Sequence, residues 1–282
     1  MDIVKAVVLG IVQGLTEFLP ISSSAHLEIV PRLLGWGDAG PAFTAVIQLG
    51  TIAAVIIYFR KDLQRMVQAF LASLKPGGDK ANIDARMAWA VIYGTIPVIV
   101  LALVFKKFIE YEFRNLYVVA TMFIVMGTLL LIAETIAKHK RTMESITVRD
   151  GWIVGLWQAL ALVPGASRSG STLTGALLTG LDREAAARFS FLLSIPAVLI
   201  SGLYEMKDVI KPKAEAASTV TLHMSLADTA IAAVVAGLVG YACIAWLLKF
   251  LRTNSTLPFI LYRYVVGGLL FYLLSSHRLL PQ

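Results

Sequence analysis

The chain has 282 residues, of which 57% are hydrophobic and 15% are charged, and its mean hydropathy is +0.75. This composition lies well outside that of a water-soluble domain and indicates a protein that lies mostly within a lipid bilayer. Although the net charge is +7, the basic residues flank apolar segments and form no stripe with aromatic residues, so anionic lipid headgroups are expected as contacts and nucleic acid is not.

Six segments are apolar over a length that can cross about 30 Å of hydrocarbon, the thickness of a bilayer core. They lie at about 42–59, 88–105, 116–136, 186–204, 226–249 and 258–275. Since these segments use most of the chain, residues 1–282 are expected to form a single membrane domain. The longest polar connections, around 60–87 and 205–225, are predicted to be surface loops or short interfacial helices.

The first apolar segment, at about 3–34, differs from the six spans because polar residues interrupt it. Gln13 and Glu17 are four residues apart and would share one face of a helix, and Pro20 would end that helix. Non-helical backbone is stable at membrane depth only where protein or a wet cavity surrounds it. The segment is therefore predicted to be a re-entrant helix-loop-helix hairpin.

Side chains that suit phosphate chemistry lie at the break in this hairpin. Ser22, Ser23 and Ser24 stand where a new helix would start, and the N-terminus of a helix binds anions. A helix that begins here would set His26 beside Ser23, which is the pairing that activates a serine. The plainer alternative is that the serines only cap a helix; an ionisable Glu17 at membrane depth favours the functional interpretation.

A second interrupted segment, at about 150–181, holds a run of small and hydroxyl residues after Pro164. Arg168 offers a permanent charge and a bidentate fork that matches phosphate. The hydroxyl groups around it, which can donate to phosphate oxygens, belong to Ser167, Ser169, Ser171 and Thr172. A solvated linker is the alternative, but apolar residues enclose the run on both sides. Since no Gly-Lys-Ser/Thr sequence follows, this is not a nucleotide-binding P-loop.

The two halves of the chain resemble each other. Residues 155–160 repeat the pattern of residues 10–15, and each run is followed by a proline and a serine-rich turn. The repeats would cover about 1–141 and 145–282, each with one interrupted segment and three full crossings. An odd number of crossings inverts the second half. We therefore predict an all-α polytopic membrane protein with an inverted-topology repeat, six full transmembrane helices and two re-entrant hairpins that meet near the midplane.

Lysine and arginine are distributed unequally between the two sides of this topology. The side that holds loops 60–87, 137–188 and 249–257 carries more of them than the side that holds both termini. Because cytoplasmic loops are enriched in these residues, both termini are predicted to lie outside the cytoplasm.

The two polar motifs resemble those of the bacitracin-resistance type of undecaprenyl-diphosphate phosphatase, and the resemblance covers essentially the whole chain. The motifs are Glu/Gln-x-x-x-Glu at 13–17, Pro-x-Ser-Ser-x-x-His at 20–26 and Pro-Gly-x-Ser-Arg-Ser-x-x-Thr at 164–172. Members of this family have inverted repeats, six full spans and two re-entrant hairpins, so the resemblance implies the same fold.

The resemblance also implies an activity and a location. It implies hydrolysis of undecaprenyl diphosphate to undecaprenyl phosphate and inorganic phosphate on the outer, periplasmic face of a bacterial inner membrane, which recycles the lipid carrier for cell-wall synthesis. A divalent cation, Mg²⁺ or Ca²⁺, is implied as cofactor, and a homodimer is a further expectation. Gln13 stands where many relatives have Glu, so Glu17 with substrate phosphates and water would hold the cation.

The mechanism expected from these residues is attack by Ser23 on the terminal phosphorus, with His26 and Glu17 aligning or deprotonating the hydroxyl. Arg168 and the hydroxyls at 167 and 172 would stabilise the transferred phosphoryl group. The serines at 22, 24 and 169 are further expected phosphate contacts. Ser22 is the second choice for the nucleophile and direct attack by His26 is the third.

Two other functions are compared with the pattern of this sequence by their own signatures. Inverted repeats with broken helices are also the pattern of secondary transporters, so a lipid-phosphate or anion transporter or flippase is the alternative function. The other type of membrane lipid phosphatase relies on a Lys-to-Arg-Pro run and a Ser-Gly-His triplet, and the sequence contains neither.

Overall fold

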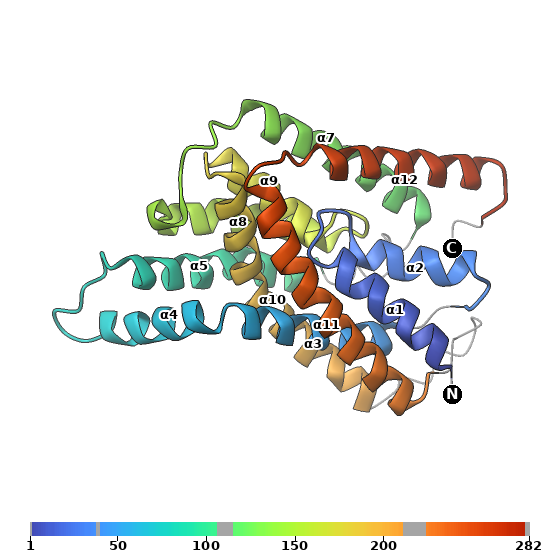
Figure 1. Ribbon diagram of the computed structural model, residues 1–282, viewed down its shortest axis with the longest axis horizontal. Coiled ribbons are helices and arrows are strands. Elements are labelled where there is room, and N and C mark those ends of the chain that lie inside the picture. The colour runs from blue at the N-terminus through green and yellow to red at the C-terminus, as the bar shows by residue number, and fades with distance from the viewer. Residues whose placement is uncertain (1, 38–39, 106–114, 211–223, 280–282) are drawn as a thin grey trace.

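The structure is a computed structural model that describes residues 2–37, 40–105, 115–210 and 224–279. Over these ranges the chain folds into helices and contains no β-strand (Figure 1). The elements are α1 Ile3–Thr16, α2 Ser23–Leu33, α3 Gly40–Tyr58, α4 Arg60–Ser73, α5 Ile83–Val104, α7 Leu116–Ile136, η1 Met143–Ser145, α8 Val148–Ala159, η2 Leu160–Leu162, α9 Arg168–Leu178, α10 Arg183–Ile210, α11 Leu226–Leu251 and α12 Leu257–Ser275.

Five of these helices are long and apolar enough to cross a membrane, namely α5, α7, α10 as far as Gly202, α11 and α12. They cover five of the six predicted spans, so the chain is a multi-pass membrane protein. The sixth predicted span falls on α3, which meets the same criterion only together with α4. The two helices are bent by 76° between them.

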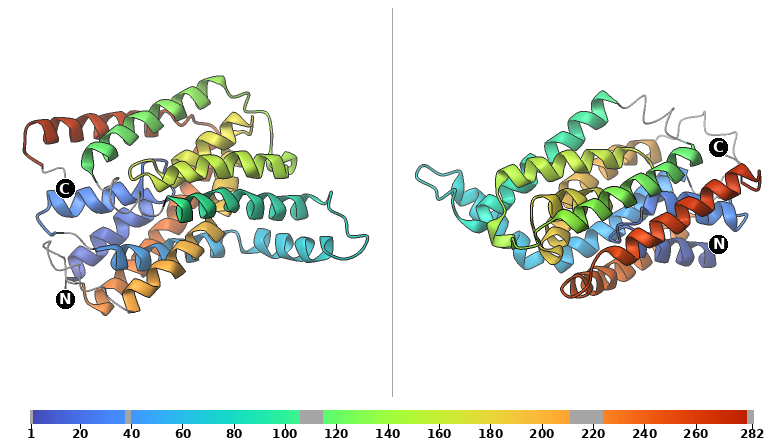
Figure 2. Two further views of the ribbon diagram at one scale, coloured as in Figure 1. Left: turned by 180° about the vertical axis from the view of Figure 1, so that it is seen from behind. Right: turned by 90° about the horizontal axis from the view of Figure 1, so that it is seen from above.

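The polar connection at 60–87 is more ordered than a loop. It contains α4 and the start of α5, and these two helices lie side by side where they project from the rest of the molecule (Figures 1 and 2). Of the two alternatives predicted for this segment, the helical one is confirmed. Most of the other connection, at 205–225, lies outside the described residues.

The core is built around α10, which packs against α3, α5 and α9. Among the five long helices α10 is the most enclosed, because 67% of its apolar window is buried, against 33% to 44% in the other four. Phe189, Phe191 and Leu193 of α10 belong to the largest cluster of buried apolar side chains. Helices α7 and α12 pack against each other along one edge of the molecule (Figure 1).

Each interrupted segment begins with a helix that lies very close to a long helix. A Cβ on Gly14 of α1 would lie 2.8 Å from the carbonyl oxygen of Ala236 in α11. In the same way, a Cβ on Gly155 of α8 would lie 2.2 Å from the carbonyl oxygen of Gly94 in α5. Small residues that let two backbones approach closely are a common basis of helix association in membranes.

Both interrupted segments contain a break, followed by a second helix. The first break joins α1 to α2 through Pro20, and the second joins η2 to α9 through Pro164. The residues before α2 and α9, Ser22 and Ser167, have φ of +75° and +73°. Non-glycine residues rarely adopt this left-handed conformation, and they keep it where the surrounding structure demands it. We call these two segments, residues 17–22 and 163–167, the first and second break.

Candidate active site

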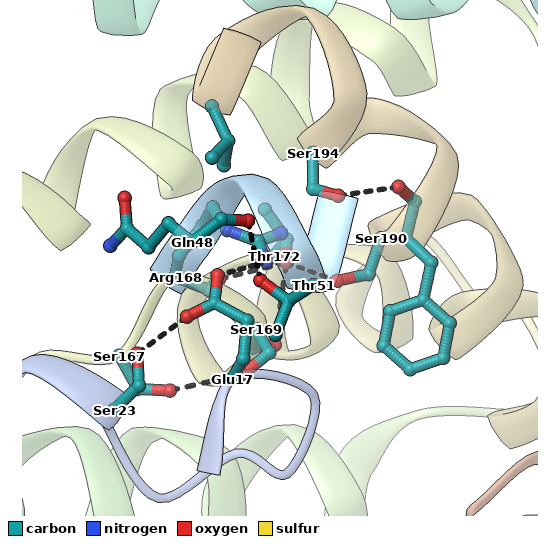
Figure 3. A network of polar contacts seen from close by, with 12 residues as sticks. Glu17, Ser23, Gln48, Thr51, Ser167, Arg168, Ser169, Thr172, Ser190 and Ser194 are labelled. Atoms are coloured by element: carbon teal, nitrogen blue, oxygen red, sulfur yellow. Dashed lines mark hydrogen bonds and ion pairs between the residues drawn. The ribbon is translucent and has the colours of Figure 1, made fainter. Parts of the chain in front are cut away.

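Glu17 lies at the centre of the site, in the first break. Its side chain is buried and accepts hydrogen bonds from three donors, of which Figure 3 labels Ser23 and Arg168. The Ser23 hydroxyl donates to Oε2 at 2.6 Å, Gln13 Nε2 donates to the same oxygen at 3.0 Å, and Arg168 Nη2 donates to Oε1 at 2.9 Å. A buried charge requires a partner and hydrogen bonds, and Arg168 supplies both from the second half of the chain.

Ser23 and Glu17 are arranged as a serine nucleophile and its base would be. Ser23 is the first residue of α2, and its half-buried hydroxyl already directs its hydrogen at a carboxylate oxygen. A general base must lie within hydrogen-bond reach of the proton that it removes, and the 2.6 Å separation meets this condition. The predicted grouping of Gln13, Glu17 and Ser23 is therefore present as one connected cluster.

His26 lies near this cluster, but it does not contact Ser23 in the way that was predicted. Its Nδ1 lies 2.6 Å from the carbonyl oxygen of Ser22, and its Nε2 lies 2.6 Å from the hydroxyl of Tyr262. Because a carbonyl only accepts, the neutral ring carries its hydrogen on Nδ1, and Nε2 accepts from Tyr262. The predicted Ser23–His26 contact was wrong, since Nδ1 donates back to the Ser22 carbonyl and Nε2 is engaged by Tyr262 of α12.

Tyr262, which the sequence analysis missed, holds the His26 ring from α12. The two rings stack with their centroids 5.7 Å apart and their planes 17° apart. The residues are separated by 236 positions in the chain. A tyrosine inside an apolar span carries no sequence signal of such a contact, because tyrosine is common in membrane helices for other reasons.

Arg168 has a second nitrogen aimed at no protein group. Arg168 is the first residue of α9, and its Nη2 binds Glu17. Its Nη1 is buried and has no hydrogen-bond partner among the described residues. Buried donors are almost always satisfied, so an unpartnered guanidinium nitrogen beside a nucleophile indicates a place for an anionic oxygen.

The first turns of α2 and α9 meet at this cluster. Ser23 and Arg168 are the first residues of the two helices, and both residues contact Glu17. The first N–H groups of a helix have no carbonyl partner within the helix, and the helix dipole makes this end electropositive. The side chains and helix ends together are suited to binding an anion.

The other predicted hydroxyls of α9 have structural partners. The Ser167 hydroxyl caps α9 by accepting from Gly170 N at 3.1 Å, and the Ser169 hydroxyl donates to the Leu19 carbonyl at 2.9 Å. The second of these bonds joins α9 to the first break. The Thr172 hydroxyl, predicted to bind phosphate, is fully buried and donates to the Arg168 carbonyl at 2.8 Å. It therefore holds the first turn of α9.

The two other serines near the start of α2 differ in exposure. Ser22 is buried, Ser24 is exposed, and their hydroxyl oxygens lie 3.3 Å apart. Ser171, which follows on α9, is fully buried, and its hydroxyl has no partner among the described residues.

Further polar side chains that the sequence analysis missed lie around this cluster (Figure 3). They belong to the long helices α3 and α10 and comprise Gln48, Thr51, Ser190 and Ser194. The Ser190 hydroxyl lies 2.5 Å from that of Thr172, which ties α10 to α9. Single polar residues in a long apolar span resemble packing residues, so the sequence alone did not separate them from the rest of the helix.

The donor set around Glu17 fits a hard cation only in part. The described residues contain no group of three or more His, Cys, Asp or Glu side chains that could hold a metal ion. The Oε1 of Gln13, however, is buried without a hydrogen-bond partner. One carboxylate and one amide oxygen are ligands that Mg²⁺ and Ca²⁺ accept, provided that phosphate oxygens and water complete the coordination.

The chain is similar over almost its whole length to known proteins. A family model for bacitracin resistance protein BacA matches residues 6–269. An undecaprenyl-diphosphatase of Myxococcus xanthus is 52% identical over 100% of this chain and 92% of its own length. One from Renibacterium salmoninarum is 51% identical over 98% of this chain and 97% of its own. Undecaprenyl-diphosphatase 2 of Streptomyces coelicolor is 47% identical over 99% and 97% of the two chains.

Proposed function

Because the chain belongs to the family of bacitracin resistance protein BacA, we propose that it hydrolyses undecaprenyl diphosphate to undecaprenyl phosphate and inorganic phosphate. The family resemblance drawn from the two motifs is confirmed. One observation carries the proposal at the level of the site: the Ser23 hydroxyl donates to Glu17 at 2.6 Å, and the same carboxylate binds Arg168, which keeps an unpartnered nitrogen.

In the first step, Ser23 Oγ forms a bond to the terminal phosphorus while the bond from this phosphorus to the bridging oxygen breaks. The Ser23 proton passes to Glu17, which already accepts it as a hydrogen bond. Undecaprenyl phosphate leaves with the electron pair of the broken bond. The product on the protein is a phosphoserine.

In the second step, water attacks the phosphorus of the phosphoserine, and the bond from phosphorus to Ser23 Oγ breaks. Glu17 returns its proton to Ser23, and the proton lost by the water stays with the released phosphate. Arg168 and the N-terminal ends of α2 and α9 stabilise the charge on the phosphoryl oxygens in both steps. Most of the rate enhancement comes from this positioning and charge stabilisation.

A divalent cation is part of the proposal. Glu17 and the Oε1 of Gln13 would hold it together with substrate oxygens, and it would supply neutralisation of the phosphate charge.

The proposed topology is an inverted repeat with six full spans and a re-entrant hairpin from each side of the membrane. Reciprocal packing supports it: α1 packs against α11 as α8 packs against α5, α3 pairs with α10, and α7 pairs with α12. The shared backbone conformation of Ser22 and Ser167 is a second support. The charge distribution favours both termini on the periplasmic side. Membership of the family supports a bacterial inner membrane protein whose site faces the periplasm. The prenyl chain would stay in lipid. A homodimer stays a prediction.

The proposal is tested by phosphate release from undecaprenyl diphosphate by the purified protein in detergent. We expect release by the wild type, loss of release in Ser23→Ala and Arg168→Ala, and labelled phosphate on Ser23 after rapid quench. Full activity in Ser23→Ala, or label on His26, would contradict the assigned nucleophile. If proteoliposomes instead move a lipid phosphate or phosphate without hydrolysis, the protein is a transporter.

A further inference from the structure

Arg263 is a buried arginine in the middle of α12, outside both sequence motifs. Only 1% of it is exposed, and it is among the largest fully buried side chains of the described chain. Its guanidinium donates to five backbone carbonyls, at Phe123 (3.1 Å, from Nε), Pro20 (3.1 Å, from Nη1), Met122 (2.9 Å, from Nη2), Gly165 (2.9 Å, from Nη2) and Ala166 (3.2 Å, from Nη2).

These carbonyls come from three separate parts of the chain. Pro20 lies in the first break, Gly165 and Ala166 lie in the second, and the others lie on α7. Among the described residues, no backbone N–H donates to the carbonyls of Pro20, Gly165 and Ala166, and leaving them unpaired at membrane depth would be costly. One side chain therefore satisfies backbone groups of both breaks at the same time.

Arg263 is held without a counter-charge. Its guanidinium carbon lies 5.1 Å from the centre of the Phe123 ring, and no ion pair to a carboxylate is formed within the described residues. A buried arginine is tolerated where its planar fork is fully hydrogen-bonded. Since the carboxylate of the site, Glu17, binds Arg168 instead, the two arginines have separate partners.

We propose that Arg263 is a positioning residue for the reaction proposed above, on which this inference rests. It fixes the Ser23–Glu17 pair relative to Arg168 by binding the carbonyls of both breaks. The Ser169 hydroxyl of α9 also donates to the Leu19 carbonyl in the first break, but this bond fixes one point only. The α9 end lies close to the guanidinium, because a Cβ on Gly170 would be 3.4 Å from Arg263 Nη1.

The guanidinium fork is required for this role. A lysine at 263 would keep one charge but would offer three donors from a single nitrogen, which cannot reach carbonyls in several directions. A methionine would keep the length of the side chain and remove every donor.

The test compares Arg263→Met with Arg141→Met in purified protein. Arg141 is a matched control, because it also makes five hydrogen bonds, to Ser145, Asp150 and Thr179, and it lies outside both breaks. We expect Arg263→Met to lower kcat by about 100-fold, the order found when catalytic groups move by about 1 Å, with a much smaller change in KM. Arg141→Met should lower stability and leave kcat per folded protein near that of the wild type.

Two further measurements separate positioning from general stability. Arg263→Lys should recover part of kcat. In a double-mutant cycle, Arg263→Met should cost much less in an Arg168→Lys background than in the wild type, because displacing Arg168 matters less once its fork is gone. Independent effects of the two substitutions, or equal kcat losses in Arg263→Met and Arg141→Met, would overturn the inference.

A readout without catalysis keeps the inference separate from the proposed function. Hydrogen–deuterium exchange of the two breaks, residues 17–22 and 163–167, should rise in Arg263→Met and stay unchanged in Arg141→Met. Unchanged exchange in both variants would overturn the positioning role. Absence of phosphate release by the wild type would overturn the proposed function alone.

Discussion

Glu17 and Arg168 stand 151 positions apart in the chain and meet through a 2.9 Å ion pair at the junction of the two breaks. Glu17 lies in the same half of the chain as Ser23, and Arg168 lies in the other half. Neither half alone contains both charges, so the site exists only where the two halves meet. Because the Glu17 carboxylate contacts both Ser23 and Arg168, the first prediction concerns removal of its negative charge.

Glu17→Gln keeps the shape of the side chain and removes the proton acceptor. We expect kcat for phosphate release to fall by about 1,000-fold, because general base catalysis contributes on this order. The variant should also unfold at a lower temperature, since Arg168 loses its counter-charge. Steady-state phosphate release and thermal unfolding in detergent measure the two effects.

The matched control is Glu28→Gln on the same helix as Ser23. Glu28 pairs with Arg32 at 2.9 Å on a partly exposed face, and pairs of this kind contribute little to stability. The Glu28→Gln variant should therefore keep the kcat and the unfolding temperature of the wild type. A Glu17→Gln variant with near-normal kcat would remove Glu17 from the role of base.

Tyr262→Phe removes the hydroxyl that donates to His26 and keeps the stacked ring. If the orientation of His26 matters for catalysis, kcat should fall by roughly tenfold, which corresponds to about the free energy of one hydrogen bond. The same substitution in a His26→Ala background should have little further effect, because the acceptor is already lost. Tyr241→Phe, a partly exposed tyrosine of α11, is the control. A normal kcat in Tyr262→Phe would show that this hydrogen bond is not needed.

Gly155→Ala tests the close contact of α8 with α5. The added Cβ would lie 2.2 Å from the Gly94 carbonyl oxygen, so one backbone must move. Forcing extra atoms into a packed contact costs about 1–3 kcal/mol, and the thermal midpoint should fall accordingly. Gly268→Ala is the control because its Cβ would meet nothing within 4 Å. Equal midpoints for the two variants would contradict the packing described for α8.

Chelation tests the cation. Removal of divalent ions should abolish phosphate release, and added Mg²⁺ or Ca²⁺ should restore it. Gln13→Glu would place a second carboxylate beside Glu17, so half-maximal activation should occur at a lower cation concentration. Gln64→Glu on α4 is the matched control. Full activity in excess chelator would exclude a divalent cation from the reaction.

The site was predictable in its composition and only partly in its geometry. Glu17, Ser23 and Arg168 could be found from the sequence because polar residues at membrane depth stand out against apolar surroundings. The contact of His26 could not, because helical spacing gives the face of a residue but not its rotamer or its partner. Tyr262 and Arg263 act through contacts with distant segments, and only the tertiary fold reveals such contacts.

The fold, like the site, could be predicted from the sequence only in part. Length and hydropathy located the long helices to within a few residues, since these properties follow directly from the thickness of a bilayer. The bend between α3 and α4 could not be located in this way, because both sides of Phe59 are helical and the change is one of direction. The approach of α8 to α5 also depends on a glycine pair whose partners lie far apart in the chain.

The position of Arg263 in the last helix has a consequence for the order in which the protein is made. Both sequence motifs are synthesised well before α12, but the carbonyls of Pro20 and Gly165 receive their shared donor only when α12 is in place. Until then the breaks lack the group that aligns them. If Arg263 positions the breaks as proposed, we expect a nascent chain that stops before α12 to be embedded in lipid and inactive in phosphate release.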